Sequence, residues 1–458
     1  MSNQEIGLTP KRVPHQESKF RKIVTEIPAP GTEAAFADLN RYESRSMHGQ
    51  LPVIWDMAKG CQVFDRHGNI WIDFTSTIFV ANAGHGHPRI LEAIRQITDQ
   101  SLLHSYTFGT DIRIKYLEKL VKFLPQPLDK VFLLSSGTET TECAMKLMRL
   151  HGLNSGKKKG GIISFEGAMH GRTLGAVMMG GSDASRAWIG SDDPNIHRFP
   201  FPYPWSTEKL SGTELAKRDL TLLQESGLDL SKDICGIMIE SYQGWGGVFY
   251  PVDYIQTLDN FAKQNNVLMV FDEVQSGFGR TGKLFAYEHY GVKPDIICCG
   301  KGMSSGFPLA GVFGRAEIMD LPDIGSMSST HSANPLACAV GLANLEVMEE
   351  ENLVAEAARK GKIMFDHLYL LQARFPNHIS HILGKGLLAA LLVVDPKTRK
   401  ADGPSATRIC ELAMQKGLLV VHTGRESIKL GPPLSIPDEA LVEGLNVLSE
   451  AATEIFSS

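Results

Sequence analysis

The side chains best suited to chemistry follow short apolar runs, at the places where strands of a sheet would end. Three of them are charged and follow the runs 234–239, 267–271 and 296–299: Glu240, Asp272 and Lys301. A fourth group, Ser136-Gly137-Thr138, follows the run 130–134 and opens a helical pattern over 138–150. Because ligands of α/β sheets bind outside the carboxyl ends of the strands, we expect these groups to converge on one rim.

Each group at this rim suits one part of a single cofactor. The free N–H groups and the dipole of a helix N-terminus at Gly137 and Thr138 favour a phosphate. Asp272, at the end of a buried strand, needs a cationic partner, and a protonated pyridine nitrogen is one. Lys301 lies in a glycine-flanked turn and can approach an aldehyde closely. Together these groups predict a site for pyridoxal 5'-phosphate (PLP).

The elements that would position these groups alternate along the chain. The strand candidates 130–134, 161–165, 234–239, 267–271 and 296–299 are mostly apolar, which is typical of strands covered by helices on both faces. Helical patterns separate them, so the middle of the chain predicts an α/β fold. A hairpin is predicted over 61–74, around a turn at His67-Gly68-Asn69. A long helical stretch begins after about residue 333, and 385–458 reads as a smaller α+β lobe.

We therefore expect four segments. Residues 1–44 form an N-terminal arm that is loose unless it packs on a partner. Residues 45–87 form the N-terminal part of a small domain, 88–334 the large PLP-binding domain, and 335–458 the C-terminal small domain.

Composition and charge exclude several other classes of protein. The 458 residues are 43% hydrophobic and 21% charged, and the net charge of -5 attracts neither nucleic acid nor an anionic membrane. No apolar run approaches the roughly 18 residues of a membrane span. The seven cysteines include no Cys-x-x-Cys pair, which predicts buried thiols in a reducing compartment. We expect a cytoplasmic protein without nucleic-acid or membrane partners.

A stretch of 44 residues, 271–314, carries a family resemblance. It reads FDEVQSGFGRTGKLFAYEHYGVKPDIICCGKGMSSGFPLAGVFG, and HGNIWIDF, NAGHGHP, SSGTE, MHGRT and PPLSI stand around it in matching order. The sequence resembles the class III (omega-type, subgroup II) aminotransferases of PLP fold type I. The resemblance implies an aspartate-aminotransferase-like large domain with a mostly parallel sheet, and a smaller α+β domain built from the N- and C-terminal parts. It also implies a homodimer with shared active sites, or a dimer of dimers.

The same resemblance implies the activity and the roles of site residues. The enzyme would move an amino group between an amine, ω-amino acid, amino sugar or amino acid and a keto acid or aldehyde. Lys301 would hold PLP as an aldimine and carry the proton in a ping-pong mechanism, while Asp272 would pair with the pyridinium nitrogen. Val274 would cover one ring face, and Gln275 would reach the ring hydroxyl. The remaining cofactor contacts implied are Ser136, Gly137, Thr138, Met169, His170, Glu240 and, from the other subunit, Thr330. The substrate contacts implied are Ile78, Arg172, the gate residue Glu240, and Lys429.

Two positions depart from the pattern of the family. Met169 stands where most members place an aromatic ring over the cofactor, and a thioether covers the ring less rigidly. Lys429 stands where many members place an arginine that docks the α-carboxylate, and a lysine cannot make that two-pronged contact. We therefore expect a main substrate whose reacting carbon carries no carboxylate: a terminal amine, an ω-amino acid or an amino sugar.

Other interpretations remain open at this stage. A PLP-dependent racemase or epimerase shares the fold, and a binding module without catalysis would not need both Lys301 and Asp272. The 277–283 loop partly matches nucleotide-binding patterns, but Leu284 stands where a Mg²⁺-binding Ser or Thr belongs, so we interpret the loop as shaped around the cofactor rim. His85 and His87 lack a third ligand, and we predict no metal site.

Overall fold

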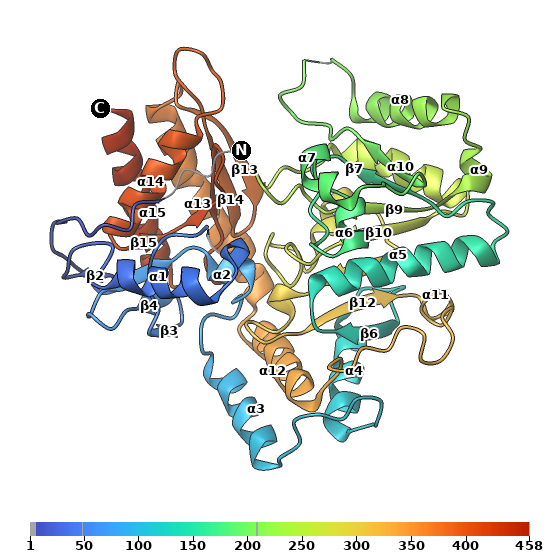
Figure 1. Cartoon of the computed structure of the whole chain (residues 1–458), viewed down its shortest axis with the longest axis horizontal. Coiled ribbons are helices and arrows are strands. Elements are labelled where there is room, and N and C mark those ends of the chain that lie inside the picture. The colour runs from blue at the N-terminus through green and yellow to red at the C-terminus, as the bar shows by residue number, and fades with distance from the viewer. Residues whose placement is uncertain (1–5, 48, 208, 458) are drawn as a thin grey trace.

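The computed structural model describes residues 6–47, 49–207 and 209–457, which contain three sheets (Figure 1). The largest sheet has seven strands in the order β6-β12-β11-β10-β9-β7-β8. All neighbours in it are parallel except β12, which is antiparallel to both β11 and β6. The predicted mostly parallel sheet is confirmed. Its strands are β6 (Lys130–Leu134), β7 (Gly161–Phe165), β8 (Ile196–Phe199), β9 (Ile234–Glu240), β10 (Leu268–Asp272), β11 (Ile296–Cys299) and β12 (Ala310–Gly314).

Adjacent residues on these strands enter different cores, which explains why the strands are apolar throughout. Leu134 and Ile162 pack in one core with α5 (Gly137–Asn154). Leu133 precedes Leu134 and Ile163 follows Ile162, and both pack in the other core. Residues of α10 (Val252–Gln264) belong to that core as well. The sheet is thus covered by helices on both faces, as an α/β fold requires.

The other helices surround the three sheets, and two of them form the long helical stretch predicted after residue 333. These two are α12 (Pro335–Glu350) and α13 (Leu353–Arg374). Asn334 caps α12 by accepting a hydrogen bond from Ala337 N at 2.8 Å, and Pro335 occupies the first turn. The rest are α1 (Thr32–Tyr42), α2 (Ser76–Phe79), α3 (Pro88–Asp99), α4 (Asp111–Phe123), α6 (Leu174–Met178), α7 (Asp183–Arg186), α8 (Gly212–Glu225), α9 (Leu230–Asp233), α11 (Ala316–Met319), α14 (Gly403–Gln415) and α15 (Asp438–Phe456).

The two smaller sheets join the beginning and the end of the chain. One contains β1 (Gln16–Glu17), β2 (Lys22–Ile23), β3 (Met57–Lys59), β4 (Gln62–Phe64), β5 (Ile70–Asp73) and, beside β5, the C-terminal β15 (Leu418–Leu419). The other contains β13 (Ile379–Lys385), β14 (Leu388–Val393), β16 (Val421–His422) and β17 (Ser427–Leu430). The predicted hairpin is confirmed as β4–β5. In Figure 1 these elements lie together on one side, away from the seven-stranded sheet. The numerical domain boundaries stay a prediction.

The N-terminal arm is not loose, and that expectation was wrong for its described part. Ile23 and Ile27 are completely buried, β2 pairs with β5, and Arg21 Nε donates to Glu443 Oε1 at 2.9 Å. The arm therefore packs on its own chain, because its apolar residues complete the core beside the hairpin. Residues 1–5 of the predicted arm lie outside the described residues.

Arg280 connects the large sheet to the C-terminal part of the chain. Its fully buried guanidinium donates to Leu387 O at 3.1 Å, Pro432 O at 2.6 Å and Asn82 Oδ1 at 2.6 Å. Burial lowers the pKa of Arg280 to about 10. The 277–283 loop thus packs against the C-terminal part of the chain, and its predicted place at the cofactor rim stays a prediction.

The cysteines agree with a further expectation. All seven cysteines are buried and unpaired. Burial raises the pKa of thiols such as Cys61, to about 11, which makes them inert. Among the described residues, no helix has the length and apolar character needed to cross a bilayer.

Candidate active site

A cavity of about 690 Å³ opens at the carboxyl ends of the central strands. It falls within the range of about 300–1,000 Å³ typical of ligand sites. Most of the predicted site residues line it: Ser136, Gly137, Thr138, Met169, His170, Arg172, Glu240, Asp272, Val274, Gln275, Lys301 and Lys429. Glu240 and Asp272 are the last residues of β9 and β10 and are paired in register, rather than following the strands as predicted.

Asp272 is held by a histidine that lies 102 positions earlier in the chain. Its Oδ2 is 2.9 Å from His170 Nδ1, and its Oδ1 accepts from Val274 N at 3.0 Å. Both side chains are almost completely buried, and His170 Nε2 has no partner among the described residues. A buried carboxylate with such donors stays ready to bind a cation in the cavity.

Lys301 begins the short 3-10 helix η4 (Lys301–Met303) directly after β11. Its φ of 44° is left-handed, a conformation that costs a non-glycine residue about 1–2 kcal/mol. Desolvation lowers the pKa of Lys301, and the carboxylates of Asp272 and Glu240 oppose that shift. A lysine with a lowered pKa is more often the neutral amine that attacks a carbonyl carbon.

Glu240 is a second carboxyl group with an unused atom in the same cavity. Burial raises its pKa to about 7, although His170 opposes the shift. Its Oε1 accepts from Gly244 N at 3.2 Å, and its Oε2 has no partner among the described residues. It can therefore accept or release a proton near neutral pH.

Lys429 reaches the cavity from β17, on the four-stranded sheet. Its Nζ donates to Gly244 O at 2.5 Å and to Gln275 Oε1 at 3.1 Å, and lies 4.6 Å from the centre of the Phe79 ring. Burial and the nearby Lys301 lower its pKa to about 7. Within the described part of the chain, Lys429 forms no ion pair with Glu240 and is bonded to Gly244 and Gln275 instead.

The N-terminus of α5 faces the cavity with free backbone donors. Within the described part of the chain, the N–H groups of Gly137 and Thr138 have no acceptor. A Cβ added to Gly137 would lie 2.6 Å from Val274 Cγ1, so a glycine is needed where α5 meets Val274. Thr138 Oγ1 is 2.6 Å from Thr173 Oγ1, which orients its hydroxyl.

Two predicted residues lie away from this cavity. Thr330 is exposed, is not among the described residues that line the cavity, and has its carbonyl 2.7 Å from His104 Nε2, although Ser329 Oγ beside it lies 3.5 Å from Glu139 Oε1 in the first turn of α5. Ile78 lines a neighbouring cavity of about 290 Å³. It belongs to a run of four left-handed residues, Ser76 to Phe79, that turns its side chain to that side.

The turn after β9 holds residues that the sequence analysis missed. Tyr242, Gly244 and Trp245 line the cavity, and the Arg425 guanidinium stacks 3.8 Å above the Trp245 ring. Their place directly after a strand on the same rim was the signal that could have identified them.

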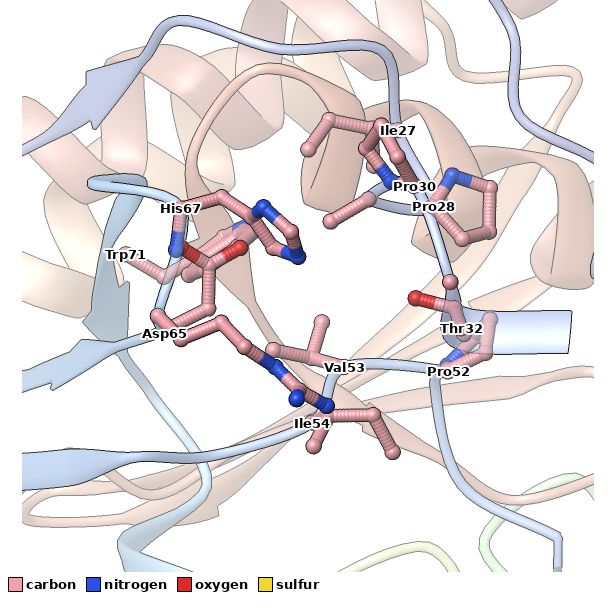
Figure 2. A pocket seen from close by; sticks show the side chains of 13 residues that line it. Ile27, Pro28, Pro30, Thr32, Pro52, Val53, Ile54, Asp65, His67 and Trp71 are labelled. Carbon is pink, nitrogen blue, oxygen red and sulfur yellow. The ribbon is translucent and has the colours of Figure 1, made fainter. Parts of the chain in front are cut away.

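Other sites considered from the sequence or the surface are too small or already satisfied. Figure 2 shows a hollow between the arm and the β4–β5 hairpin, where Ile27 and Pro30 face His67 across a space of only about 10 Å³. His85 Nε2 is 2.7 Å from Asp73 Oδ2, and His87 Nε2 is 2.9 Å from Glu351 Oε1. Neither the hollow nor these histidines offers a site for a cofactor.

The residues of the large cavity fit PLP. Free N–H groups at Gly137 and Thr138 suit a phosphate, the buried Asp272 suits a protonated ring nitrogen, and the Lys301 amine suits an aldehyde. The unpartnered Glu240 Oε2 and His170 Nε2 leave further polar atoms for a bound group.

Comparison with known proteins agrees with this fit. The family model described as "Aminotransferase class-III" matches residues 44–452. An ornithine aminotransferase of Emericella nidulans is 33% identical over 94% of this chain and 92% of its own length. A 4-aminobutyrate aminotransferase of Mycobacterium leprae is also 33% identical, over 94% and 97% of the two chains. A structure of the ornithine aminotransferase of Toxoplasma gondii, described with PLP at its active site, is 27% identical with a TM-score of 0.81, covering 92% of this chain and 94% of its own.

Proposed function

The chain belongs to the class-III aminotransferase family and is a PLP-dependent aminotransferase, and from this premise we propose that its amino donor is an ω-amino acid. Such a donor carries the amine on a carbon without a carboxylate, and its carboxylate lies at the far end. The family and the named relatives favour transamination over the racemase alternative.

When bound, PLP supplies a ring that withdraws electrons from the carbon bearing the amino group. In our proposal Lys301 Nζ holds the aldehyde carbon of the cofactor and carries the proton at the reacting carbon. Asp272, supported by His170, keeps the ring nitrogen protonated. Gly137 and Thr138, with the neighbouring Ser136, hold the phosphate.

The ring of the cofactor would lie between two side chains of the cavity. We place Val274 on one face of the ring and Met169 on the other, and Gln275 at the ring hydroxyl. The flexible thioether of Met169, whose residue is 48% exposed, leaves the outer face adaptable to different donors.

The substrate proposal is carried by Arg172. This arginine lines the cavity, is exposed, and has no acidic partner in the described part of the chain. Lys429, by contrast, is buried and already bonded to Gly244 and Gln275. A donor with its amine near Lys301 and its carboxylate at Arg172 satisfies this distribution of charge. Ornithine and 4-aminobutyrate, for which the relatives are named, both carry a terminal amine.

Half-reactions followed by stopped-flow absorbance test the donor. We expect 4-aminobutyrate and ornithine to convert the cofactor with a higher kcat/KM than alanine. Arg172→Met should raise KM for 4-aminobutyrate about tenfold or more, because the carboxylate of this donor loses its partner. The KM for a terminal amine without a carboxylate should stay almost unchanged. Arg95→Met on α3, where Arg95 is exposed and pairs with Glu92, is the matched control. A wild type that reacts only with α-amino acids would end the proposal.

We further propose a homodimer in which each subunit completes the site of the other. The loop before α4 and its first turn expose apolar side chains: Leu103, Tyr106, Phe108 and Ile114. This surface adjoins Thr330, because His104 contacts Thr330 O and Tyr106 OH lies 3.0 Å from Ser328 Oγ. A second copy on this surface would bury the apolar patch and receive Thr330 at its phosphate site. The buried thiols support the cytoplasm as the compartment.

A further inference from the structure

Lys429 has at most one hydrogen-bond donor left for a substrate. An ammonium group has three donors. Two of them serve Gly244 O at 2.5 Å and Gln275 Oε1 at 3.1 Å, and the group lies 4.6 Å from the centre of the Phe79 ring. The residue is 4% exposed. A carboxylate that bound Lys429 through two hydrogen bonds would have to break one of these contacts first.

Two neighbours lie on either side of the Lys429 amine. The Phe79 ring packs closely on Gly431, where an added Cβ would lie 1.8 Å from Phe79 Cε1. The Gly244 carbonyl, at the turn after β9, accepts a hydrogen bond from the amine. The amine acts here as a point donor rather than a fork.

The contact with Lys429 fixes which end of the Gln275 amide faces which way. The Lys429 amine has N–H groups to donate whether it is protonated or neutral, and Gln275 Oε1 is the atom that accepts one of them at 3.1 Å. Tyr242 OH, 3.4 Å away, adds a second donor to the same oxygen. The amide nitrogen therefore points elsewhere, and Nε2 has no acceptor among the described residues although Gln275 lines the cavity.

We propose that Lys429 is a positioning residue that orients the Gln275 amide, so that an N–H group rather than an oxygen faces the ring hydroxyl of the cofactor. The inference rests on the proposed contact between Gln275 and that hydroxyl. The oxygen on a pyridine ring is an acceptor when ionised, so an amide N–H stabilises it and an amide oxygen repels it. Lys429 sits on β17 and Gln275 follows β10, so the contact also joins the small sheet to the large one.

The test measures PLP binding in the absence of any substrate, where a residue that only docks substrate has no effect. The apoprotein of wild type, Lys429→Met, Gln275→Leu and the double variant is titrated with PLP, and its fluorescence quenching gives Kd. Each single variant should bind PLP about 3- to 10-fold more weakly, the effect of one hydrogen bond. The double variant should be no weaker than the weaker single one, because both changes remove the same contact. The pH dependence of the cofactor absorbance band should shift in the same way in all three variants.

Control variants distinguish a failure of the positioning role of Lys429 from a failure of the proposed contact of Gln275. Lys360→Met removes another buried lysine that donates to a carbonyl, Leu434 O at 2.9 Å, and should leave the Kd for PLP unchanged. Lys429→Arg keeps donors at the position and should bind PLP within about threefold of wild type, which keeps the test open if Lys429→Met does not fold. Unchanged PLP binding in Lys429→Met, or additive losses in the double variant, would overturn the positioning role. Unchanged binding in Gln275→Leu would instead refute the proposed contact of Gln275, and the inference with it.

Discussion

The hydrogen bond between His170 and Asp272 gives a prediction whose size follows from the structure. In His170→Leu, Asp272 loses the donor 2.9 Å from Oδ2 and keeps only the Val274 N–H on Oδ1. A hydrogen bond to a charged group contributes about 1.5–3 kcal/mol. If this hydrogen bond stabilises the ionised Asp272 in the transition state, its loss should lower kcat about 10- to 150-fold.

Stability should respond differently from activity in this variant. The substitution also removes the unpartnered His170 Nε2, a buried polar atom that itself costs about 1–3 kcal/mol. The two effects on folding oppose each other, so thermal unfolding should shift by only a few degrees. Single-turnover absorbance gives the rate, and calorimetry gives Tm.

The control for this variant is a half-buried histidine that does not line the cavity. His197 on β8 also has an unpartnered Nε2, and His197→Leu should keep full activity. A His170→Leu enzyme with the wild-type kcat would refute the reasoning. So would an equal loss of activity in His197→Leu.

The remaining predictions concern four other residues. Lys301→Ala should abolish turnover while the protein still folds, and a wild type that is colourless and takes up no PLP would contradict the site. Asp272→Asn should lower kcat about 10²-fold or more, because a neutral amide does not hold the ring nitrogen protonated, and steady-state kinetics measure this. Thr330→Ala should weaken PLP binding by about 1.5–3 kcal/mol, and activity should fall on dilution below the dimer dissociation constant; a fully active monomer would exclude the shared site. Burial raises the pKa of Glu240 to about 7, so its stabilising protonated form is lost as pH rises from about 4.5 through 7. The wild-type apoprotein should therefore lose about 3 kcal/mol of unfolding free energy across that interval relative to Glu240→Gln. If the difference in denaturant midpoint between the two proteins does not change with pH, Glu240 titrates normally.

Much of the fold was predictable because its signals are local. The strands β6, β7 and β11 have the predicted limits, since each is a short, mostly apolar run that is bounded by loop residues. The site was predictable for the same reason: carboxyl ends of neighbouring parallel strands lie at one edge, which brings Glu240 and Asp272 together.

The remainder depends on contacts between distant parts of the chain. The sequence analysis did not predict β12, whose glycines weaken a strand pattern, and nothing local places it antiparallel between β11 and β6. Two contacts form only after the strands and domains have packed: the hydrogen bond between His170 and Asp272, and that between Lys429 and Gln275. The prediction for the arm was wrong because its many charged residues indicate a loose segment, whereas Ile23 and Ile27 become buried once the chain has folded.

Arg280 has a consequence for the recombination of this protein with its relatives. Its guanidinium is bound by the backbone carbonyls of Leu387 and Pro432 and by the side chain of Asn82. A chimera that exchanges the C-terminal part replaces only carbonyl groups, which every residue supplies provided that the two loops keep their shape. A crossover between positions 82 and 280 with a relative that lacks this asparagine or this arginine separates the amide from its partner, and the buried cation then loses one of its hydrogen bonds. Viable crossovers should therefore cluster after residue 280, and Asn82 and Arg280 should be inherited as a pair.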